Sequence, residues 1–182
     1  SYKTFLAPGN GGISTYGAAD VQGVPLAGYI EAFIREEVTE GVEIDDIPAR
    51  LLEHFRKLPG PPQTQFLVAG YQTQEGRREQ RVWEVSVGGN SFQRGDEPGQ
   101  QGARWGGEPD ILTRLTNRVA VLDAAGKPSE PLPSYGIPWQ FFTLQDAIDF
   151  AVFAVRVTID SIRFQTRPKT VGGPIDVLVI KP

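Results

Sequence analysis

The sequence contains no cysteine and no methionine, and its single histidine is His54. The absence of cysteine excludes disulfides, a thiol nucleophile and cysteine-ligated metal sites within these 182 residues. One histidine argues against a histidine-rich zinc site, and also against a Ser-His-Asp triad with a histidine to spare. We therefore expect neither a metal nor a cofactor.

Long apolar runs and concentrated positive charge are also missing. No apolar stretch reaches the length of a membrane-spanning helix without a charged residue interrupting it. The formal net charge is −4 and the basic residues are scattered, which argues against a nucleic-acid surface or a membrane-binding patch. No secretory signal is visible. We expect a cytoplasmic protein with no nucleic-acid or membrane partner.

The chain has an ordinary globular composition and is long enough to bury a core. Apolar residues at helical spacing predict helices over 25–38, 44–58, 108–115 and 142–164. Short β-prone runs predict strands at 11–17, 65–72, 81–89 and 175–180, with 65–72 and 81–89 joined as a hairpin. The helix at 142–164 is apolar on more than one side, so we expect it to be largely buried. Because helices and strands do not alternate, the order favours an α+β arrangement over a parallel sheet.

Few side chains suggest chemistry by themselves. His54 lies beside an apolar helix stripe, where a half-packed helix residue is favoured over a lone general base, because no nucleophile or metal ligand is evident nearby. Adjacent carboxylates such as Asp45-Asp46 point in different directions and do not form a catalytic pair. The glycine-rich stretch 88–107 lacks the lysine of a phosphate-binding loop, so a surface loop is favoured there. Glu31 and Arg35 have the i,i+4 spacing of a favourable ion pair.

Three stretches share a more specific pattern. They are KTFLAPGNGGISTYGAAD (3–20) before the first helix, TQFLVAGYQ with RVWEVSVGG (64–72 and 81–89), and VGGPIDVLVI (171–180) after a long apolar helix. Together they resemble the proteasome β-subunit type of N-terminal nucleophile hydrolase, in its bacterial and archaeal forms. The resemblance covers nearly the whole chain. It implies a four-layer αββα sandwich with two antiparallel sheets, as a single domain over 1–182 that lacks the first N-terminal strands.

The resemblance also implies site residues. Lys3 matches the catalytic lysine of the family, and Gly17 matches the glycine whose backbone N–H stabilises the oxyanion. Thr15, Ala18 and Ala19 would line the substrate pocket. The family cleaves peptide or amide bonds with an N-terminal Thr, Ser or Cys, as threonine-type proteases do. A homo-oligomeric hydrolase acting on a peptide or amide substrate is therefore expected.

The nucleophile is left open. In the family it lies on its own strand well before the lysine, whereas only Ser1 and Tyr2 precede Lys3. We reject Ser1, because two residues cannot form the hairpin that would return it to the lysine. The abrupt start and the lack of an initiator methionine favour an upstream segment that carries the nucleophile.

Val171 favours a different interpretation, because active relatives often carry serine at that position. The alternative is a noncatalytic structural or assembly subunit of a proteasome-like oligomer. A third and weaker interpretation is a carbohydrate- or ligand-binding α+β module that uses the glycine-rich stretch.

Overall fold

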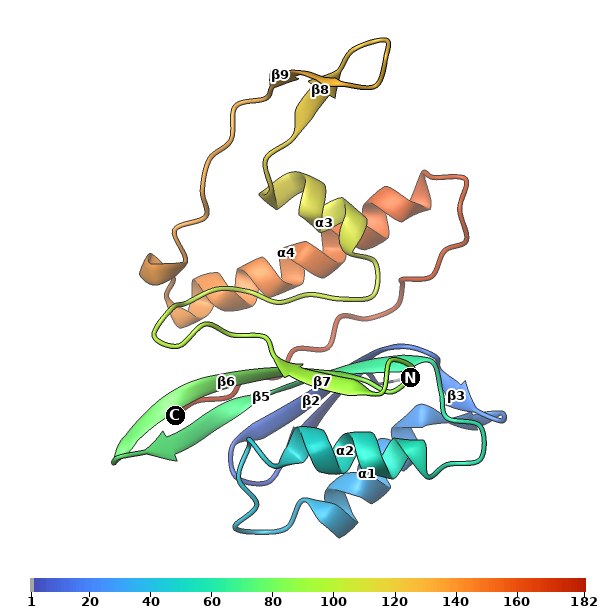
Figure 1. The fold of residues 1–182 in the computed structure, drawn as a ribbon, viewed down its shortest axis with the longest axis vertical. Coiled ribbons are helices and arrows are strands. Elements are labelled where there is room, and N and C mark those ends of the chain that lie inside the picture. Colours follow the sequence, from blue (N-terminus) through green and yellow to red (C-terminus); the bar gives the residue numbers. More distant parts are fainter. Residues whose placement is uncertain (1) are drawn as a thin grey trace. The chain divides into compact units, whose positions relative to one another are not determined.

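The computed structural model describes residues 2–182 and divides the chain into two compact units. Unit 1 runs to Arg104 and also contains the C-terminal segment Asp176–Pro182, and unit 2 is Trp105–Ile175. Each unit has its own helices and strands (Figure 1). Ser1, which we reject as the nucleophile, lies outside the described residues.

Unit 1 is built on a five-stranded antiparallel sheet with the order β1-β2-β5-β6-β7. Its strands are β1 (Thr4–Ala7), β2 (Gly11–Gly17), β5 (Thr64–Gln74), β6 (Arg77–Ser86) and β7 (Ser91–Arg94). A two-stranded ladder of β3 (Asp20–Val21) and β4 (Val24–Pro25) follows β2. The predicted hairpin is confirmed as β5–β6. Its turn residues Glu75 and Gly76 have φ of 50° and 76°, as a type I′ turn requires.

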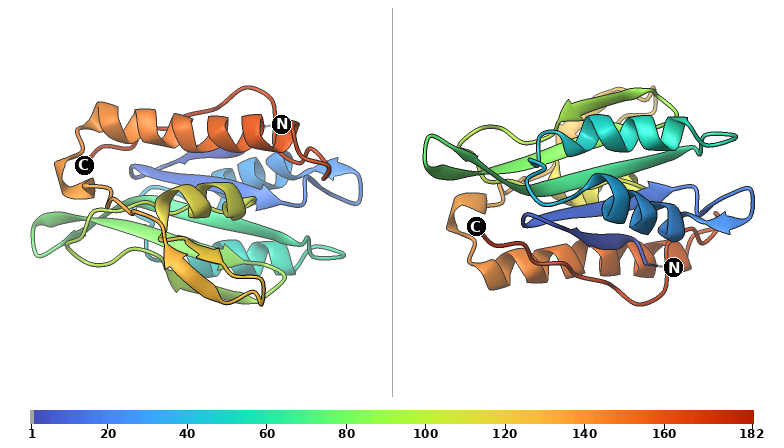
Figure 2. Two further views of the ribbon diagram at one scale, coloured as in Figure 1. Left: turned by 90° about the horizontal axis from the view of Figure 1, so that it is seen from above. Right: turned by 90° about the horizontal axis from the view of Figure 1, so that it is seen from below.

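Two helices cover one face of this sheet, α1 (Leu26–Glu37) and α2 (Ile47–Arg56) (Figures 1 and 2). They confirm the two amphipathic helices predicted in the first third of the chain. Their apolar stripes bury Phe33 and Phe55 against strand residues such as Phe66, whose ring centroid lies 4.8 Å from that of Phe55. The core of unit 1 therefore lies between one sheet face and these helices.

The C-terminal residues of unit 1 add side chains to the other sheet face. Gly12 and Ile13 are neighbours on β2, so they lie on opposite faces of the sheet. Ile13 belongs to the core under the helices, which places Gly12 on the other face. A Cβ at Gly12 would come within 2.8 Å of the side chains of Leu178 and Ile180. The predicted strand at 175–180 is wrong, because this segment forms no ladder with any strand among residues 2–182. Its apolar side chains pack on the sheet, and its backbone does not extend the sheet.

Unit 2 contains α3 (Pro109–Thr116), the hairpin of β8 (Ala120–Leu122) and β9 (Pro128–Pro131), a 3-10 turn (Trp139–Phe141) and α4 (Leu144–Arg163). Both α-helices confirm predicted helices. α4 begins with a capping box, in which the Asp146 N–H donates to Thr143 Oγ1 at 3.2 Å. In return the Thr143 N–H donates to the Asp146 carboxylate at 2.8 Å.

Unit 2 by itself does not give this helix the burial that we expect. Of the 20 residues of α4, only Thr158 and Ile162 are buried, and Phe153 remains 48% exposed. Within unit 2 the neighbouring helix is α3, which has 8 residues. A helix of that length can cover only about two turns of α4.

The described residues form a small α+β fold, and the expected four-layer αββα sandwich is wrong. Such a sandwich needs two large sheets packed face to face. Among residues 2–182 the five-stranded sheet is accompanied only by the two-stranded ladders β3–β4 and β8–β9 and by four α-helices. Pro128 and Pro131 in β9 cannot donate ladder hydrogen bonds, which limits growth of that hairpin into a larger sheet.

Candidate functional site

The β1–β2 hairpin brings two predicted site residues to one end of the sheet. Strand pairing places Lys3 opposite Thr15, whose N–H donates to the Lys3 carbonyl at 2.9 Å. Gly17 ends β2 two residues after Thr15. Lys3 and Gly17 therefore lie near the same end of the hairpin.

Gly17 has a backbone conformation that requires glycine. Its φ is +101°, and a Cβ there would lie 2.6 Å from the carbonyl oxygen of Gln63. The next residue, Ala18, donates its N–H to the same carbonyl at 3.0 Å. Because N–H groups alternate in direction along an antiparallel strand, the Gly17 N–H points away from β5, toward the β1 side. A role of this N–H in stabilising an oxyanion stays a prediction.

Thr15 is buried on the sheet face that the helices cover. Its Oγ1 lies 3.1 Å from Oγ1 of Thr64 and 3.3 Å from the carbonyl oxygen of Gln65. The Thr64 hydroxyl in turn donates to the carbonyl of Tyr16 at 2.9 Å. These contacts fasten the end of β2 to β5 and satisfy the Thr15 hydroxyl within the protein. A contact of Thr15 with substrate stays a prediction.

Ala18 and Ala19 begin the connection from β2 toward α1. The carbonyl of Ala19 accepts a hydrogen bond from the N–H of Leu26 at 2.9 Å, so this connection is tied to the first residue of α1. Ala19 is exposed and Ala18 is half-buried. Both alanines follow Gly17 directly, and their contact with substrate also stays a prediction.

Sequence reasoning missed Tyr16, which lies between Thr15 and Gly17. Its hydroxyl donates to Oε1 of Gln65 at 3.0 Å. Burial raises the pKa of Tyr16, and the negative charge of Glu84 raises it further. The phenol therefore stays protonated at neutral pH and remains a hydrogen-bond donor. The available signal in the sequence is its position directly before Gly17.

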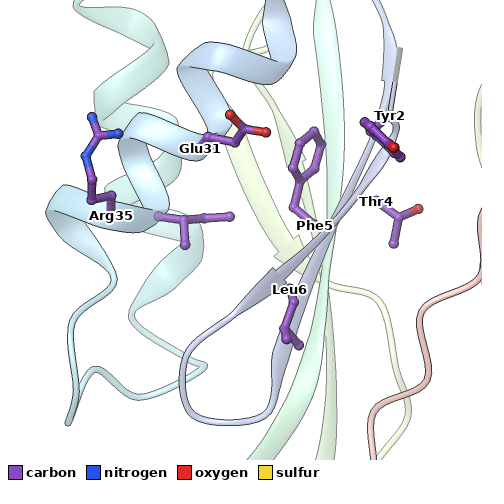
Figure 3. Close-up of a pocket in the computed structure, with 7 residues that line it drawn as sticks. Tyr2, Thr4, Phe5, Leu6, Glu31 and Arg35 are labelled. Carbon is purple, nitrogen blue, oxygen red and sulfur yellow. The ribbon is translucent and has the colours of Figure 1, made fainter.

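A depression of about 350 Å³ opens between β1 and α1 (Figure 3). Phe5 and Ile34 give it apolar walls, and Glu31 and Arg35 bring opposite charges one helical turn apart. The i,i+4 spacing predicts that these two charges pair, whereas Arg35 forms its ion pair with Glu36 at 2.8 Å. The sequence pattern therefore finds the two charges but not the depression that they border.

His54 is held between α1 and α2 by packing. Its Nδ1 lies 2.6 Å from Oε1 of Glu37. The rings of Phe33 and Phe55 meet the imidazole edge-on, with centroid separations of 5.3 and 5.4 Å. The side chain is 17% exposed. These contacts agree with the interpretation of His54 as a packed helix residue.

The glycine-rich stretch 88–107 contains β7 and is anchored to the sheet by Asp96. Arg94 donates to both carboxylate oxygens of Asp96, at 2.9 and 2.6 Å, and the Val82 N–H donates to the same group at 2.9 Å. Burial opposes ionisation of Asp96, but the hydrogen bonds from Arg94 and Val82 outweigh it and lower the pKa. This part of the stretch therefore has a structural role in fixing β7 to β6.

No group of three or more His, Asp or Glu side chains placed to hold a metal ion occurs among residues 2–182. In the same part of the chain, no helix combines the length and apolarity needed to cross a membrane. Comparisons of the chain with protein-family models, curated proteins and solved structures found no match. The family resemblance therefore stays a prediction that rests on Lys3, Gly17 and the motifs around them.

Proposed function

We propose that the protein hydrolyses peptide or amide bonds in the cytoplasm, as a proteasome-like N-terminal nucleophile hydrolase. The observation that supports this proposal is the placement of Lys3 and Gly17 at the same end of the β1–β2 hairpin. The lysine supplies a positive charge, and the glycine supplies a backbone hydrogen-bond donor. In this proposal the nucleophile is an N-terminal Thr, Ser or Cys of the natural mature protein.

The proposed reaction begins when the oxygen or sulfur of the nucleophile attacks the carbonyl carbon of the substrate. The α-amino group of the nucleophilic residue accepts its proton, and the positive charge of Lys3 favours the deprotonated nucleophile. The Gly17 N–H stabilises the negative charge that develops on the carbonyl oxygen. The C–N bond then breaks as the leaving amine takes the proton back. Water hydrolyses the resulting acyl-enzyme to a carboxylic acid and restores the nucleophile.

A covalent probe tests this proposal on the natural full-length protein. A β-lactone is expected to add one adduct to the nucleophile, detected by intact mass. Lys3→Ala should slow labelling by about 100-fold or more, which is the usual size of a lost proton-transfer or charge contribution. Lys57→Ala is the matched control, because Lys57 is exposed at the end of α2 and forms an ion pair with Glu53, and its loss should leave labelling unchanged.

Two results would contradict the proposal. One is a folded wild-type protein that forms no adduct, and the other is equal labelling of the Lys3→Ala and Lys57→Ala variants. N-terminal sequencing of the natural protein gives an independent check, because the mature chain must begin with the nucleophile. A natural chain that begins at Ser1 leaves no nucleophile where the mechanism needs one.

A noncatalytic structural or assembly subunit is the second candidate function. It is favoured by the Thr15 hydroxyl, which is already bonded to Thr64 and Gln65. It is also favoured by β1, which lies at the edge of its sheet among residues 2–182. A folded protein that self-associates but neither binds the probe nor cleaves amides would support this candidate.

A further inference from the structure

Two threonine hydroxyls are buried side by side between β2 and β5, which are neighbouring strands of the sheet (Figure 1). Thr64, the first residue of β5, is 1% exposed, and Thr15 on β2 is 6% exposed. Valine has a similar shape and would fill this part of the core without burying a polar group. Packing alone therefore does not require two hydroxyls at this place.

The hydroxyl of Thr64 donates to the backbone of β2. Its Oγ1 lies 2.9 Å from the carbonyl oxygen of Tyr16, and a carbonyl oxygen can only accept a hydrogen bond. The Thr64 oxygen is then free to accept from the Thr15 hydroxyl, which is 3.1 Å away. The other acceptor of Thr15, the carbonyl of Gln65, is further away at 3.3 Å. Donation therefore runs from Thr15 through Thr64 to the Tyr16 carbonyl.

This carbonyl belongs to the peptide group that carries the Gly17 N–H. The peptide bond between Tyr16 and Gly17 is trans, so its C=O and N–H point in opposite directions within one plane. Thr64 bonds to one end of this peptide group, and the other end is the N–H that the proposed reaction uses. Glycine restricts backbone rotation less than other residues do, so an outside contact has more to fix here.

The peptide group on the other side of Gly17 is held as well. The Ala18 N–H donates to the carbonyl oxygen of Gln63 at 3.0 Å. Gln63 and Thr64 are consecutive, so two neighbouring residues at the start of β5 hold both peptide groups of Gly17. The Gln63 contact uses a backbone carbonyl, which every residue provides, whereas the Thr64 contact needs a hydroxyl. Thr64 is therefore the position at which substitution tests this arrangement.

We infer that Thr64 is a positioning residue for the Gly17 N–H, an inference that rests on the proposed function. Its bond to the Tyr16 carbonyl holds the peptide plane, so the N–H stays directed at the oxygen that becomes negative in the reaction. The same bond polarises the peptide group, which makes the N–H a stronger donor. Thr15 adds to this effect, because its hydroxyl donates to the Thr64 oxygen.

Labelling kinetics of the natural full-length protein with a β-lactone test the inference. Thr64→Val should lower the maximal labelling rate constant by about tenfold, which is less than the loss for removing an oxyanion donor outright. The probe concentration that gives half the maximal rate should stay the same, because no contact with the probe is removed. Thr64→Ser keeps the hydroxyl and should label like wild type.

The double variant Thr15→Val/Thr64→Val separates positioning from folding. It replaces both hydroxyls by apolar groups of similar shape, so its resistance to urea should stay near that of wild type. Its maximal labelling rate constant should still fall by about tenfold. Thr158→Val is the matched control, because Thr158 is a buried threonine whose hydroxyl donates to the Ala154 carbonyl within α4. This control should label like wild type.

The nitrogen chemical shift of the Gly17 amide gives a readout that does not involve the probe. A hydrogen bond to the carbonyl of the preceding residue draws electron density away from the amide nitrogen. Thr64→Val should therefore move the Gly17 nitrogen signal upfield, whereas Thr64→Ser should leave it in place. A purely structural role of Thr64 in packing predicts no such difference between the two variants.

Three outcomes overturn this inference alone. They are a Thr64→Val variant that labels as fast as a reactive wild type, a Thr64→Ser variant that labels as slowly as Thr64→Val, and a Gly17 signal that Thr64→Val leaves in place. A folded wild type that forms no adduct overturns the proposed function, and this inference with it. The two failures are therefore distinguishable.

Discussion

Unit 1 and unit 2 contain helices with similar amphipathic patterns but bury them to different extents. In unit 1, α2 has 10 residues and buries five of them, including Leu51 and Phe55. In unit 2, α4 has 20 residues and buries only Thr158 and Ile162. A five-stranded sheet offers α1 and α2 a broad apolar face, whereas α3 offers α4 a single short stripe. An apolar helix face thus identifies the surface to be covered, but not whether the helix's own unit covers it.

The aromatic residues of the two units also differ in how far they are buried. Phe55 and Phe66 in unit 1 are fully buried. In unit 2, Trp139 contacts Phe142 and Phe150 with ring centroids 5.2 and 4.9 Å apart, yet none of the three is buried. The centroid separations are similar in the two units, so the difference lies in the area removed from water. Because hydrophobic stabilisation scales with that area, the contacts in unit 1 should contribute more.

The largest effect is expected for Phe55→Ala in unit 1. Phe55 is 0% exposed and contacts Phe66, so its truncation should leave a cavity and lower the free energy of unfolding by about 3–5 kcal/mol. Phe153→Ala is the matched variant in unit 2. Phe153 is 48% exposed, and its truncation should cost about 1 kcal/mol or less. Urea-induced unfolding measures both, and equal losses would contradict the contrast between the units.

Two arginines, one in each unit, are expected to show a second and smaller difference in their contribution to stability. Arg81 in unit 1 is 4% exposed and donates to Asp45 at 3.2 Å. Arg81→Ala should cost about 2–3 kcal/mol, less than for a fully buried pair, because Asp45 is 35% exposed. Arg167 in unit 2 is 30% exposed and donates to Glu108 at 3.1 Å, so Arg167→Ala should cost about 1 kcal/mol. A larger loss of unfolding free energy in urea for Arg167→Ala would reverse this ranking.

Local sequence signals predict the local elements of this fold well. The spacing of apolar residues locates α1 and α2, and the Glu75-Gly76 turn explains why β5 and β6 pair. The segment at 175–180 has the composition of a strand but lies on a sheet face, since strand pairing depends on which neighbours are available. The predicted burial of α4 is not found in unit 2 for a similar reason, because burial there depends on the size of the neighbouring helix α3.

Local sequence signals also predict only part of the candidate site. The family resemblance singles out Lys3 and Gly17, and the hairpin register places both at one end of the sheet. Spacing does not reveal that the Thr15 hydroxyl is bonded to Thr64, because their sequence positions are 49 residues apart.

The smallest effect is expected at the start of α4. Because α4 buries few residues, its capping box should matter more to its stability than packing does. Thr143→Ala removes the hydroxyl that accepts from the Asp146 N–H, and it should cost about 1 kcal/mol of helix stability. Protection factors from amide hydrogen exchange in the first turn of α4 measure this loss. Unchanged protection would mean that the turn is held by other contacts.

The same capping box predicts a pH dependence. Hydrogen bonds from the Thr143 hydroxyl, and then from its backbone N–H, lower the pKa of Asp146. A carboxyl with a lowered pKa in the folded state stabilises that state above its unfolded pKa, and this stabilisation is lost as the pH falls through the folded value. Thr143→Ala should therefore reduce protection strongly at neutral pH and less in acid, where Asp146 is protonated. Asp160→Asn, at an exposed carboxyl further along α4, is the control and should show no such difference. An equal effect of Thr143→Ala at both pH values would mean that the cap acts without the Asp146 carboxylate.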